Sequence, residues 1–221
     1  MESSRGFTLL IGALAGAFFT FFSYLITQIS DYSWIFLGCI SMLLGILLSA
    51  SIDHWYTLST IDDATKLFNR RYLFRRIKQE LRYARRLNKP LSFIVAEVDD
   101  MRYYNNTYGH IAGDLVLTTI AQKLRSGVRR GDIVARWGGD EFGIILPNTD
   151  SNDAAIIAER LRTLIDNLQI EVADQTPVSV TISAGVASLH QGPDNAETLI
   201  KNADMAMYRA KQRKNHVVLA Q

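Results

Sequence analysis

The chain has 221 residues, a formal net charge of +2, one cysteine and four histidines. Its length suits one ordinary domain with an additional segment, and so small a net charge favours no particular class of partner. The lone cysteine excludes a disulfide framework, and the scattered histidines lack the spacing of zinc ligands.

The N-terminal quarter of the chain differs from the rest because it is almost free of charge. Two uncharged runs, residues 7–27 and 33–51, are each about as long as a helix that crosses the hydrocarbon of a bilayer. Together they predict a transmembrane hairpin over residues 1–51, with a signal peptide or a buried hairpin of a soluble protein as the alternatives. Arg5 and the basic residues after position 65 place both ends of the hairpin in the cytoplasm. We therefore expect a multi-pass protein of the cytoplasmic membrane.

A second domain is expected from residue 62 to residue 221, after a mixed connector over residues 52–65. Asn69 is a good N-cap, and apolar residues recur behind it at helical spacing over residues 73–84. The segment 66–89 is rich in Lys and Arg. It suits contact with anionic lipid or nucleic acid, or a solvated helix face, and we favour the solvated face.

Strands and helices alternate along the rest of this domain. Short apolar runs with β-branched residues indicate strands, and apolar residues at helical spacing indicate helices. We expect strands at 91–98, 132–137, 142–147 and 178–189, and helices at 114–128, 152–166 and 196–214. Residues 99–113 are expected to form a polar loop that can include a short helical turn. The class is therefore α/β or α+β with a central sheet.

The stretch RWGGDEFGIILP, residues 136–147, carries two glycines and two carboxylates between apolar runs. Gly138 and Gly139 let the backbone approach a ligand closely, so that its N–H groups can contact a phosphate. Asp140 and Glu141 would repel such an anion unless a divalent cation such as Mg²⁺ lay between them. A glycine hairpin with solvated acids is the alternative.

A second source of acidic groups lies at the end of the strand expected at 91–98. Glu97 and Asp99 share one face there, and Val98 points to the other. If this strand pairs with the hairpin, acids from two strands meet over a metal ion, as in a nucleotidyl-transfer site. The sequence thus predicts a site for a divalent cation between these strands.

Five motifs over residues 62–216 resemble the GGDEF family of diguanylate cyclases. Residues 138–142 read GGDEF, the motif that names this family. The others are DATKLFNRR, EVDDMRYYNNTYGHIAGD, VTISAGVA and ADMAMYRAK, and they occur in the family's order. The resemblance implies an α+β sandwich, like that of nucleotidyl cyclases and palm domains, with a central, mostly antiparallel sheet surrounded by helices.

The resemblance also implies a reaction, in which two GTP molecules are condensed to cyclic di-GMP and two pyrophosphates. Each domain holds one GTP, so catalysis requires a homodimer with its two sites face to face. Mg²⁺ or Mn²⁺ is the implied cofactor, GTP and cyclic di-GMP are the implied ligands, and no nucleic-acid partner is implied. Small residues at 12, 13 and 15–17 suit close packing of the N-terminal helices in such a dimer.

The resemblance assigns roles position by position. Glu141 falls on the catalytic carboxylate and Asp140 on a catalytic metal ligand, while Glu97 and the carbonyl of Val98 fall on further metal ligands. The residues implied to bind substrate are Asn105 and Asp114 for guanine, and Gly138, Gly139, Arg102 and Lys211 for phosphate. An amide and a carboxylate match donors of guanine that adenine lacks, so this pair would select GTP over ATP.

A second nucleotide site is implied by RRGD, residues 129–132, which matches the family's R-x-x-D inhibitory motif. Arg129 and Asp132 are its members, and Arg160 is expected to complete it. Arginine binds phosphate through two N–H groups and stacks on a base, which suits feedback inhibition by cyclic di-GMP. The alternative is a solvated approach to the hairpin in which both residues are free.

Three departures from the family's motifs keep other functions open. Glu97 stands where the family has Asp, Ala64 and Lys66 replace a Leu and a Gly, and the end of the last helix lacks a Gly and is one residue short. Arg213 and Lys214 are therefore alternative candidates for a second phosphate contact. The rivals are a catalytically weak, membrane-bound receptor for cyclic di-GMP or GTP, and a membrane scaffold that only dimerises. We favour the enzyme because the GGDEF turn and the guanine-reading pair are intact, and because Glu can supply the metal oxygen that Asp would.

Overall fold

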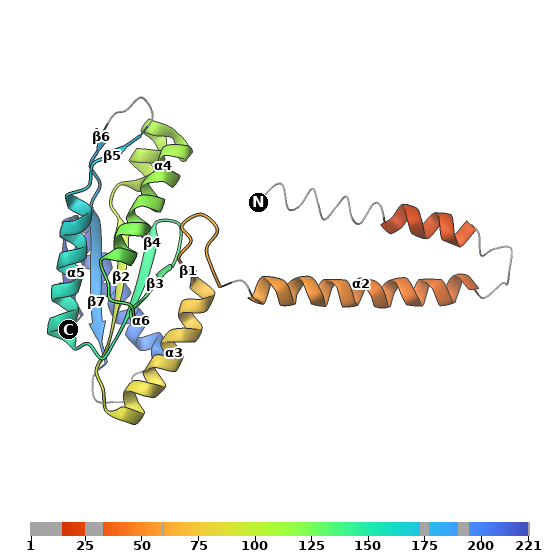
Figure 1. Ribbon diagram of the computed structural model, residues 1–221, viewed down its shortest axis with the longest axis horizontal. Helices are drawn as coiled ribbons and strands as arrows, with labels where there is room; N and C mark the ends of the chain where they lie inside the picture. The colour runs from red at the N-terminus through yellow and green to blue at the C-terminus, as the bar shows by residue number, and fades with distance from the viewer. Residues whose placement is uncertain (1–14, 25–32, 59, 173–176, 190–194, 221) are drawn as a thin grey trace. The chain divides into compact units, whose positions relative to one another are not determined.

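The computed structural model describes residues 15–24, 33–58, 60–172, 177–189 and 195–220 of the chain. The chain divides into two compact units, residues 1–59 and residues 60–221. Within the described residues the first unit is helical, and the second holds all of the strands (Figure 1).

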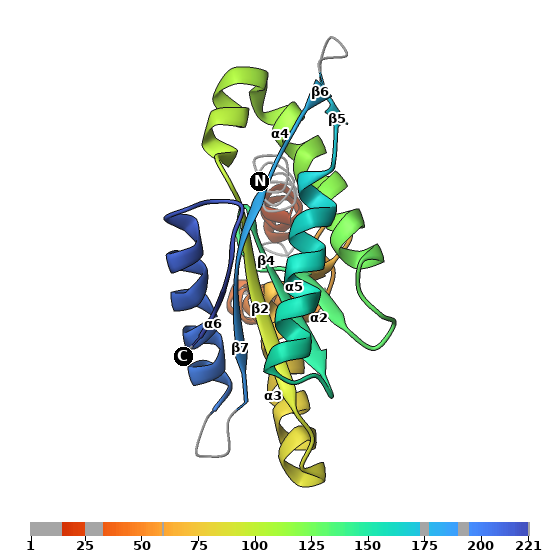
Figure 2. The same ribbon diagram turned by 90° about the vertical axis from the view of Figure 1, so that its left-hand side faces the viewer.

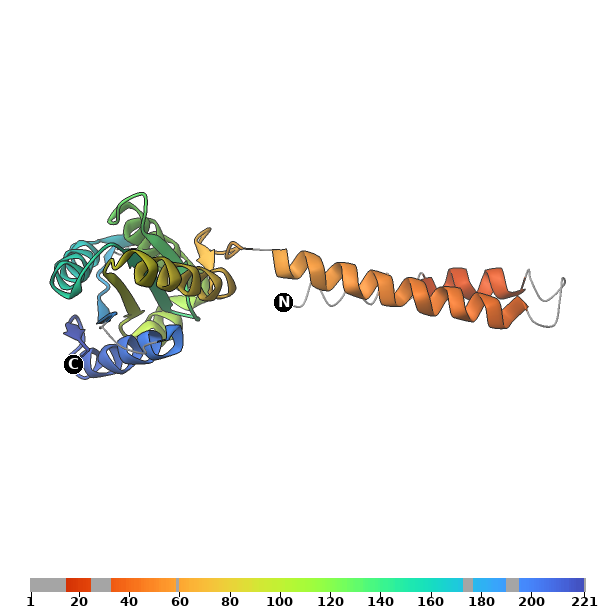
Figure 3. The ribbon, with the colours of Figure 1, turned by 90° about the horizontal axis from the view of Figure 1, so that it is seen from below.

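The first unit consists of a helix over residues 15–24 and of α2, which runs from Ser33 to Leu58 (Figure 3). Among the described residues, no helix combines the length and the apolar character that a membrane crossing requires. The predicted transmembrane hairpin therefore has no support, and the predicted location in the cytoplasmic membrane is wrong on this finding.

The two predicted spans also differ from the observed helices in their ends. Most of the first span, 7–27, lies outside the described residues, which cover it only from 15 to 24. The second span is predicted to end at Ser51, but α2 continues to Leu58 and so includes Asp53 and His54. An apolar run does not fix the end of a helix, because the backbone hydrogen bonds that hold the helix continue through polar residues.

The second unit is built on a six-stranded sheet. Its strands are β1 (Phe68–Asn69), β2 (Leu91–Val98), β3 (Ile133–Arg136), β4 (Glu141–Pro147), β7 (Ile182–Ser188) and β8 (Val217–Leu219). They lie in the order β1–β3–β4–β2–β7–β8. The three inner pairs are antiparallel, whereas the edge pairs β1–β3 and β7–β8 are parallel. The α+β class is confirmed, with a mixed sheet in which the antiparallel pairs are central.

Helices cover both faces of this sheet (Figure 2). They are α3 (Arg70–Leu87), α4 (Met101–Ser126), α5 (Ser151–Asp166) and α6 (Ala196–Lys211). Buried side chains of α4 and α5 pack on one face, and those of α3 and α6 pack on the other. The central strand β2 alternates between the two clusters, with Ile94 and Ala96 in the first and Phe93 and Val95 in the second. Burial on both faces explains why the sequence of β2 is mostly apolar instead of alternating between apolar and polar residues.

The predicted polar loop at 99–113 is mostly helical. It supplies the first part of α4, which begins at Met101. The helix is interrupted at Gly109, where φ is 83° and ψ is 165°. Up to this glycine only Met101 is buried. The segment therefore has no apolar stripe, which is the pattern that reveals a helix in sequence.

The predicted strand at 178–189 is divided. Val178 belongs to β6 (Pro177–Val178), which pairs with β5 (Ile170–Glu171) in a separate two-stranded sheet. Only from Ile182 onward does the chain join the main sheet as β7. The imperfect alternation of this segment thus reflects two strands in different sheets.

Close packing of α6 on β7 positions the helix that carries Lys211. A Cβ on Gly185, in the middle of β7, would lie 2.1 Å from the carbonyl oxygen of Ala203 and 2.1 Å from the nitrogen of Met207. No side chain fits there, so glycine lets the backbones of strand and helix approach each other.

Candidate functional site

The GGDEF residues form the turn between β3 and β4. Arg136, the last residue of β3, donates from Nε to the carbonyl of Gly138 at 3.1 Å and from a terminal nitrogen to that of Gly139 at 2.6 Å. The same guanidinium reaches the carboxylate of Asp62 at 3.3 Å. The hydrogen bonds and the ion pair of Arg136 therefore stabilise the conformation of this turn.

The two glycines of the turn have different surroundings. A Cβ on Gly138 would lie 2.6 Å from Oε2 of Glu141, whereas a Cβ on Gly139 would meet no atom within 4 Å. A side chain at Gly138 would push the Glu141 carboxylate out of its place. Gly138 therefore makes room for Glu141, and the backbone at Gly139 is open to an approaching group.

Acidic residues of β2 and β4 are brought together by the register of these strands. Glu97 and Glu141 are opposite each other in the antiparallel pair, so their side chains lie on the same face of the sheet. The N–H of Val98 donates to the carbonyl of Asp140 at 3.1 Å, which fixes the start of β4 beside the end of β2. The strand pairing on which the predicted metal site depends is therefore present.

The pKa of Glu141 is raised above its ordinary value. Burial is the largest cause, followed by the neighbouring charges of Glu97, Asp140 and Asp204, while Arg70 acts in the opposite sense. Burial and like charges both disfavour the ionised form of a carboxyl group. Such a cluster is typical of functional sites, because stability alone would select against it.

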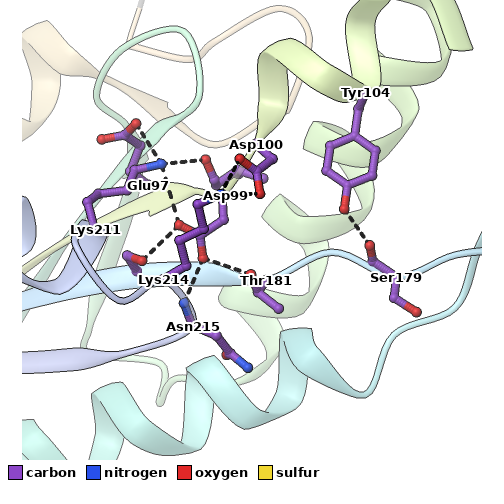
Figure 4. Close-up of polar contacts among 11 residues, drawn as sticks. Glu97, Asp99, Asp100, Tyr104, Ser179, Thr181, Lys211, Lys214 and Asn215 are labelled. Carbon is purple, nitrogen blue, oxygen red and sulfur yellow. Dashed lines mark hydrogen bonds and ion pairs between the residues drawn. The ribbon is translucent and has the colours of Figure 1, made fainter. Parts of the chain in front are cut away.

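Helix α6 brings two charged residues to these acids. Nζ of Lys211 lies 2.8 Å from Oε1 of Glu97 and donates to the carbonyl of Val98 at 2.9 Å (Figure 4). Asp204, whose charge raises the pKa of Glu141, is a neighbour that the sequence analysis missed. It precedes Lys211 by two helical turns, so the helical period of α6 could have placed both on one face.

The contacts of Lys211 test whether the predicted metal ligands suit a cation. Among the described residues, no group of three or more His, Cys, Asp or Glu side chains is arranged to hold a metal ion. The predicted set, however, has only two carboxylates, those of Glu97 and Asp140, with the Val98 carbonyl as the third donor. Two of these three donors already bind the ammonium group of Lys211. Oxygen donors of this kind fit Mg²⁺ or Mn²⁺, provided that Lys211 moves away.

Asp99 shares the ammonium group of Lys211 with Glu97, but its hydrogen bonds lead away from the turn. Its side chain is 2% exposed, and Nζ of Lys211 is 3.5 Å away. Its carboxylate accepts hydrogen bonds from the Thr181 and Ser183 hydroxyls at 2.7 and 2.8 Å, and from the Asn215 N–H at 2.9 Å (Figure 4). Asp99 therefore connects the end of β2 to β7 and to the loop that follows α6.

The same loop is also held by an ion pair. Nζ of Lys214 lies 2.7 Å from Oδ1 of Asp100, and this hydrogen bond raises the pKa of Lys214 (Figure 4). Lys214, Asn215 and Asp100 have φ values of 56°, 44° and 53°, in the left-handed region that non-glycine residues rarely adopt. The loop lacks the glycine of the resembled motif, and its polar contacts hold the strained backbone instead.

The residues predicted to read guanine lie on either side of the interruption in α4. Asn105 is half-buried before Gly109, and Asp114 is exposed after it. The side chain of Asn105 lies against Gly113, the neighbour of Asp114. The structure thus brings the two together. Arg102 is exposed on the same first segment of α4 as Asn105.

The residues of the predicted inhibitory motif are bonded to each other. Nε of Arg129 donates to Oδ1 of Asp132 at 2.9 Å, and the Arg129 N–H donates to Oδ2 at 3.1 Å. The guanidinium also contacts the carbonyl of Pro147, the last residue of β4, and the hydroxyl of Thr149, two residues further on. Asp132 is buried. The alternative in which both residues are free is therefore wrong.

Arg160, the third residue predicted for this motif, contacts the backbone two residues before Arg129. From α5 it donates a hydrogen bond to the carbonyl of Gly127 at 2.8 Å. Gly127 is the C-cap of α4, so Arg160 is held at the C-terminal end of that helix, just before the motif.

Replacing Lys211 by Met should strengthen the binding of Mn²⁺ to the nucleotide-free chain. Without the ammonium group, a divalent cation no longer has to displace a charge already bound to Glu97 and Val98. We expect a gain of about tenfold in affinity, or about 1.4 kcal/mol, measured by calorimetry. Lys211→Arg keeps the positive charge and is the control that should show no gain. Equal affinity in the Met variant and the wild type would contradict the competition.

Replacing Glu141 by Gln should stabilise the folded chain at neutral pH. Its raised pKa means that the folded state resists ionisation more than the unfolded state does. Stability is therefore lost as the pH rises from the ordinary carboxyl value of 4.5 through the raised value. The neutral amide removes this loss, so the gain should disappear below about pH 4.5. Urea denaturation across this range, in metal-free buffer, measures the difference.

Glu197→Gln is the matched control with the opposite sign. The pKa of Glu197 is lowered, chiefly by a hydrogen bond from Lys78. Its carboxylate thus contributes stability above its unfolded pKa, and this contribution is lost as the pH falls through the lowered value. The control should be slightly less stable than the wild type at neutral pH. A Glu141→Gln variant that behaves in the same way would exclude the raised pKa.

In a comparison with known proteins, residues 59–216 match the family model described as "Diguanylate cyclase, GGDEF domain". Diguanylate cyclase DosC of Escherichia coli strain K12 is 38% identical over 160 residues, which cover 72% of this chain and 35% of DosC. The chain thus spans about a third of the length of this curated relative.

Two solved structures share the fold of the second unit. The GGDEF domain of DgcB from Caulobacter crescentus, in complex with c-di-GMP, has a TM-score of 0.71 at 25% identity, over 73% of this chain and 93% of that one. The GGDEF domain of PA1120 from Pseudomonas aeruginosa has a TM-score of 0.70 at 34% identity, over 73% and 94%. Since the family match covers most of the sequence, this chain belongs to the GGDEF diguanylate cyclase domain family.

Proposed function

We propose that this chain condenses two molecules of GTP into cyclic di-GMP and releases two pyrophosphates. The observation that carries the proposal is the gathering of Glu97, Asp140 and Glu141 at the GGDEF turn of a chain from this family. Its relative DosC, which the chain matches in part, is named as a diguanylate cyclase.

Recognition of guanine falls to α4. The carboxylate of Asp114 can accept hydrogen bonds from N1–H and N2–H of guanine, and the amide of Asn105 can both donate and accept. Adenine presents no such donors to the carboxylate, so ATP would leave it unpaired. The contact of Asn105 with the neighbour of Asp114 supports their joint use.

In this proposal, phosphate is bound by the backbone at the open side of the GGDEF turn and by two basic residues, Arg102 and Lys211. The backbone at Gly139 is free of close neighbours and can approach a phosphate. Arg102 is exposed at the start of α4, where its guanidinium can bind phosphate oxygens. Lys211 is held by Glu97 and Val98 in the absence of ligand, and it becomes available to a phosphate when these oxygens bind another cation.

The residues that would hold Mg²⁺ or Mn²⁺ are Glu97, Asp140 and the carbonyl of Val98. A divalent cation bound there lowers the pKa of a nearby hydroxyl and neutralises charge on the leaving pyrophosphate. Glu97 carries one methylene more than the Asp of the family motif. Its strand position opposite Glu141 nevertheless keeps its carboxylate at the turn.

Glu141 is the proposed catalytic carboxylate. Its raised pKa brings it closer to neutral pH, where a base can both exist in its ionised form and hold a proton. It would take the proton from the 3′-hydroxyl of one GTP as that oxygen bonds to the α-phosphorus of the other. The bond from this phosphorus to the bridging oxygen breaks, and pyrophosphate leaves. The same step in the opposite direction closes the ring.

Two copies of the chain are required, because each proposed site binds one GTP. Bringing the two nucleotides face to face turns a meeting of free molecules into a reaction within one assembly. Large apolar side chains of α2, among them Phe36 and Met42, are exposed and offer a surface for association.

The R-x-x-D residues are proposed to bind the product and so limit its formation. Arg129 and Arg160 both follow or contact the end of α4, and the guanidinium group of each can bind a phosphate of a cyclic dinucleotide. Asp132 holds Arg129 in place through two hydrogen bonds. In support, the similar DgcB structure is of a complex with c-di-GMP.

The full chain, supplied with GTP and Mg²⁺ or Mn²⁺, should produce cyclic di-GMP that is detected by chromatography. The rate per chain should rise with protein concentration because the active form is a dimer. Glu141→Gln should lower the rate by about 10²-fold or more, since a neutral amide cannot accept the proton.

Glu171→Gln, at an exposed carboxylate of β5, is the matched control and should keep the full rate. A folded chain that makes no product from GTP would contradict the proposal, as would a Glu141→Gln variant with unchanged activity. Binding of cyclic di-GMP without synthesis would identify a receptor instead.

Added cyclic di-GMP should inhibit the wild-type chain, and Arg160→Ala should weaken this inhibition by about tenfold, as loss of one charged phosphate contact predicts. Arg160 donates one hydrogen bond, to Gly127, so its replacement disturbs the fold less than that of Arg129. Initial rates over a range of product concentrations measure the effect. Inhibition that is unchanged in both Arg160→Ala and Arg129→Lys would count against product binding at this motif.

A further inference from the structure

Helix α4 consists of two segments joined at Gly109. At this residue φ is 83° and ψ is 165°, a combination that is essentially restricted to glycine. The first segment begins at Met101 and the second ends at Ser126. The chain changes direction at Gly109, so the two segments do not continue one straight helix.

This change of direction creates a contact that a straight helix would not allow. In a straight helix, residues eight positions apart are separated by about 12 Å along the axis. Here Oδ1 of Asn105 lies 1.9 Å from the place that a Cβ on Gly113 would occupy, and Cγ lies 3.1 Å from it. The amide of Asn105 thus occupies the space that any other residue at position 113 would fill with its side chain.

The segment that carries Asn105 is also held by a contact outside α4. The hydroxyl of Tyr104 donates to the carbonyl of Ser179 at 2.6 Å (Figure 4). Burial of this phenol raises the pKa of Tyr104. Gly113 is itself buried. Neither side can therefore give way without cost if a methyl group is placed between Asn105 and the second segment.

We propose that Gly113 is a positioning residue for guanine recognition. It leaves room for the Asn105 amide beside Asp114, and the turn at Gly109 makes this arrangement possible. The proposal rests on the function proposed above, since it gives the contact of Asn105 with Gly113 a part in choosing guanine over adenine. Gly113 itself touches no nucleotide in this account and acts through Asn105.

Gly113→Ala is the decisive variant, and binding rather than turnover is the measurement. The probe is 3′-deoxy-GTP with Mg²⁺, which lacks the attacking hydroxyl and so cannot be consumed. Calorimetry on the full chain should show about tenfold weaker binding for Gly113→Ala, a loss similar to that in Asn105→Ala. The amide of Asn105 is proposed to recognise guanine and not adenine. Binding of 3′-deoxy-ATP should therefore be unchanged by either substitution.

A double variant separates positioning from a purely structural role. In the Asn105→Ala background the amide is gone, and the nearest remaining group is the flexible end of Met101, 2.9 Å from the added Cβ. Gly113→Ala should then cause no further loss of affinity. Independent, additive losses in the double variant would overturn the proposal. Gly45→Ala, in α2, where an added Cβ meets no atom within 4 Å, is the control and should bind as the wild type does.

The outcomes also distinguish this inference from the function on which it rests. A wild-type chain that binds neither analogue rejects both. A wild-type chain that binds 3′-deoxy-GTP, with undiminished binding in Gly113→Ala, rejects the inference alone. Alanine stabilises a helix by about 1 kcal/mol relative to glycine, so helix propensity by itself would not unfold the Gly113→Ala variant. If the single variant unfolds while the double variant folds, the clash with Asn105 is demonstrated, and if both unfold the role of Gly113 is structural only.

Discussion

The site depends on one constraint, namely that β2 and β4 hold two carboxylates opposite each other. Glu97 and Glu141 repel, yet the register that pairs them is imposed by the core. Residues of β2 are buried alternately on the two faces of the sheet. A slip by one residue would exchange the faces, so the strand cannot shift to separate the acids. The apolar core therefore supplies the free energy that keeps like charges together.

The surroundings of this carboxylate pair show how the chain tolerates it. The positively charged ammonium group of Lys211 contacts the carboxylate of Glu97 and the carbonyl of Val98. Arg70 opposes the rise in the pKa of Glu141. These contacts offset part of the repulsion between the carboxylates without removing it. Further positive charge at the site would therefore be stabilising. A divalent cation would offset the repulsion more fully than one ammonium group does.

The loop after α6 shows a related compromise between strain and polar contacts. Lys214 and Asn215 adopt left-handed backbone conformations without glycine. The bonds to Asp99 and Asp100 hold this loop to the end of β2 and the start of α4. These contacts thus join the loop after α6 to the N-terminus of α4.

The sequence by itself determined the features whose causes are local. Asn69 caps α3 as predicted, accepting a hydrogen bond from the Tyr72 N–H at 2.9 Å. The stripe behind it is buried, the apolar runs form strands, and the motifs identify the family. Caps, periodicity and motifs act within a few residues, so they can be read without knowledge of the fold. The same local reading failed for the transmembrane hairpin, since an apolar run alone does not define the helix that contains it.

Tertiary structure decided which distant residues meet. Lys211 reaches the carbonyl of Val98 across 113 positions of sequence, and Asp204 of the same helix, α6, acts on the pKa of Glu141 in β4. The contact of Asn105 with Gly113 requires a bend that the local pattern does not reveal. Such contacts depend on sheet register, on helix packing and on single backbone angles. These are set by the burial of the whole core rather than by any short stretch of the chain.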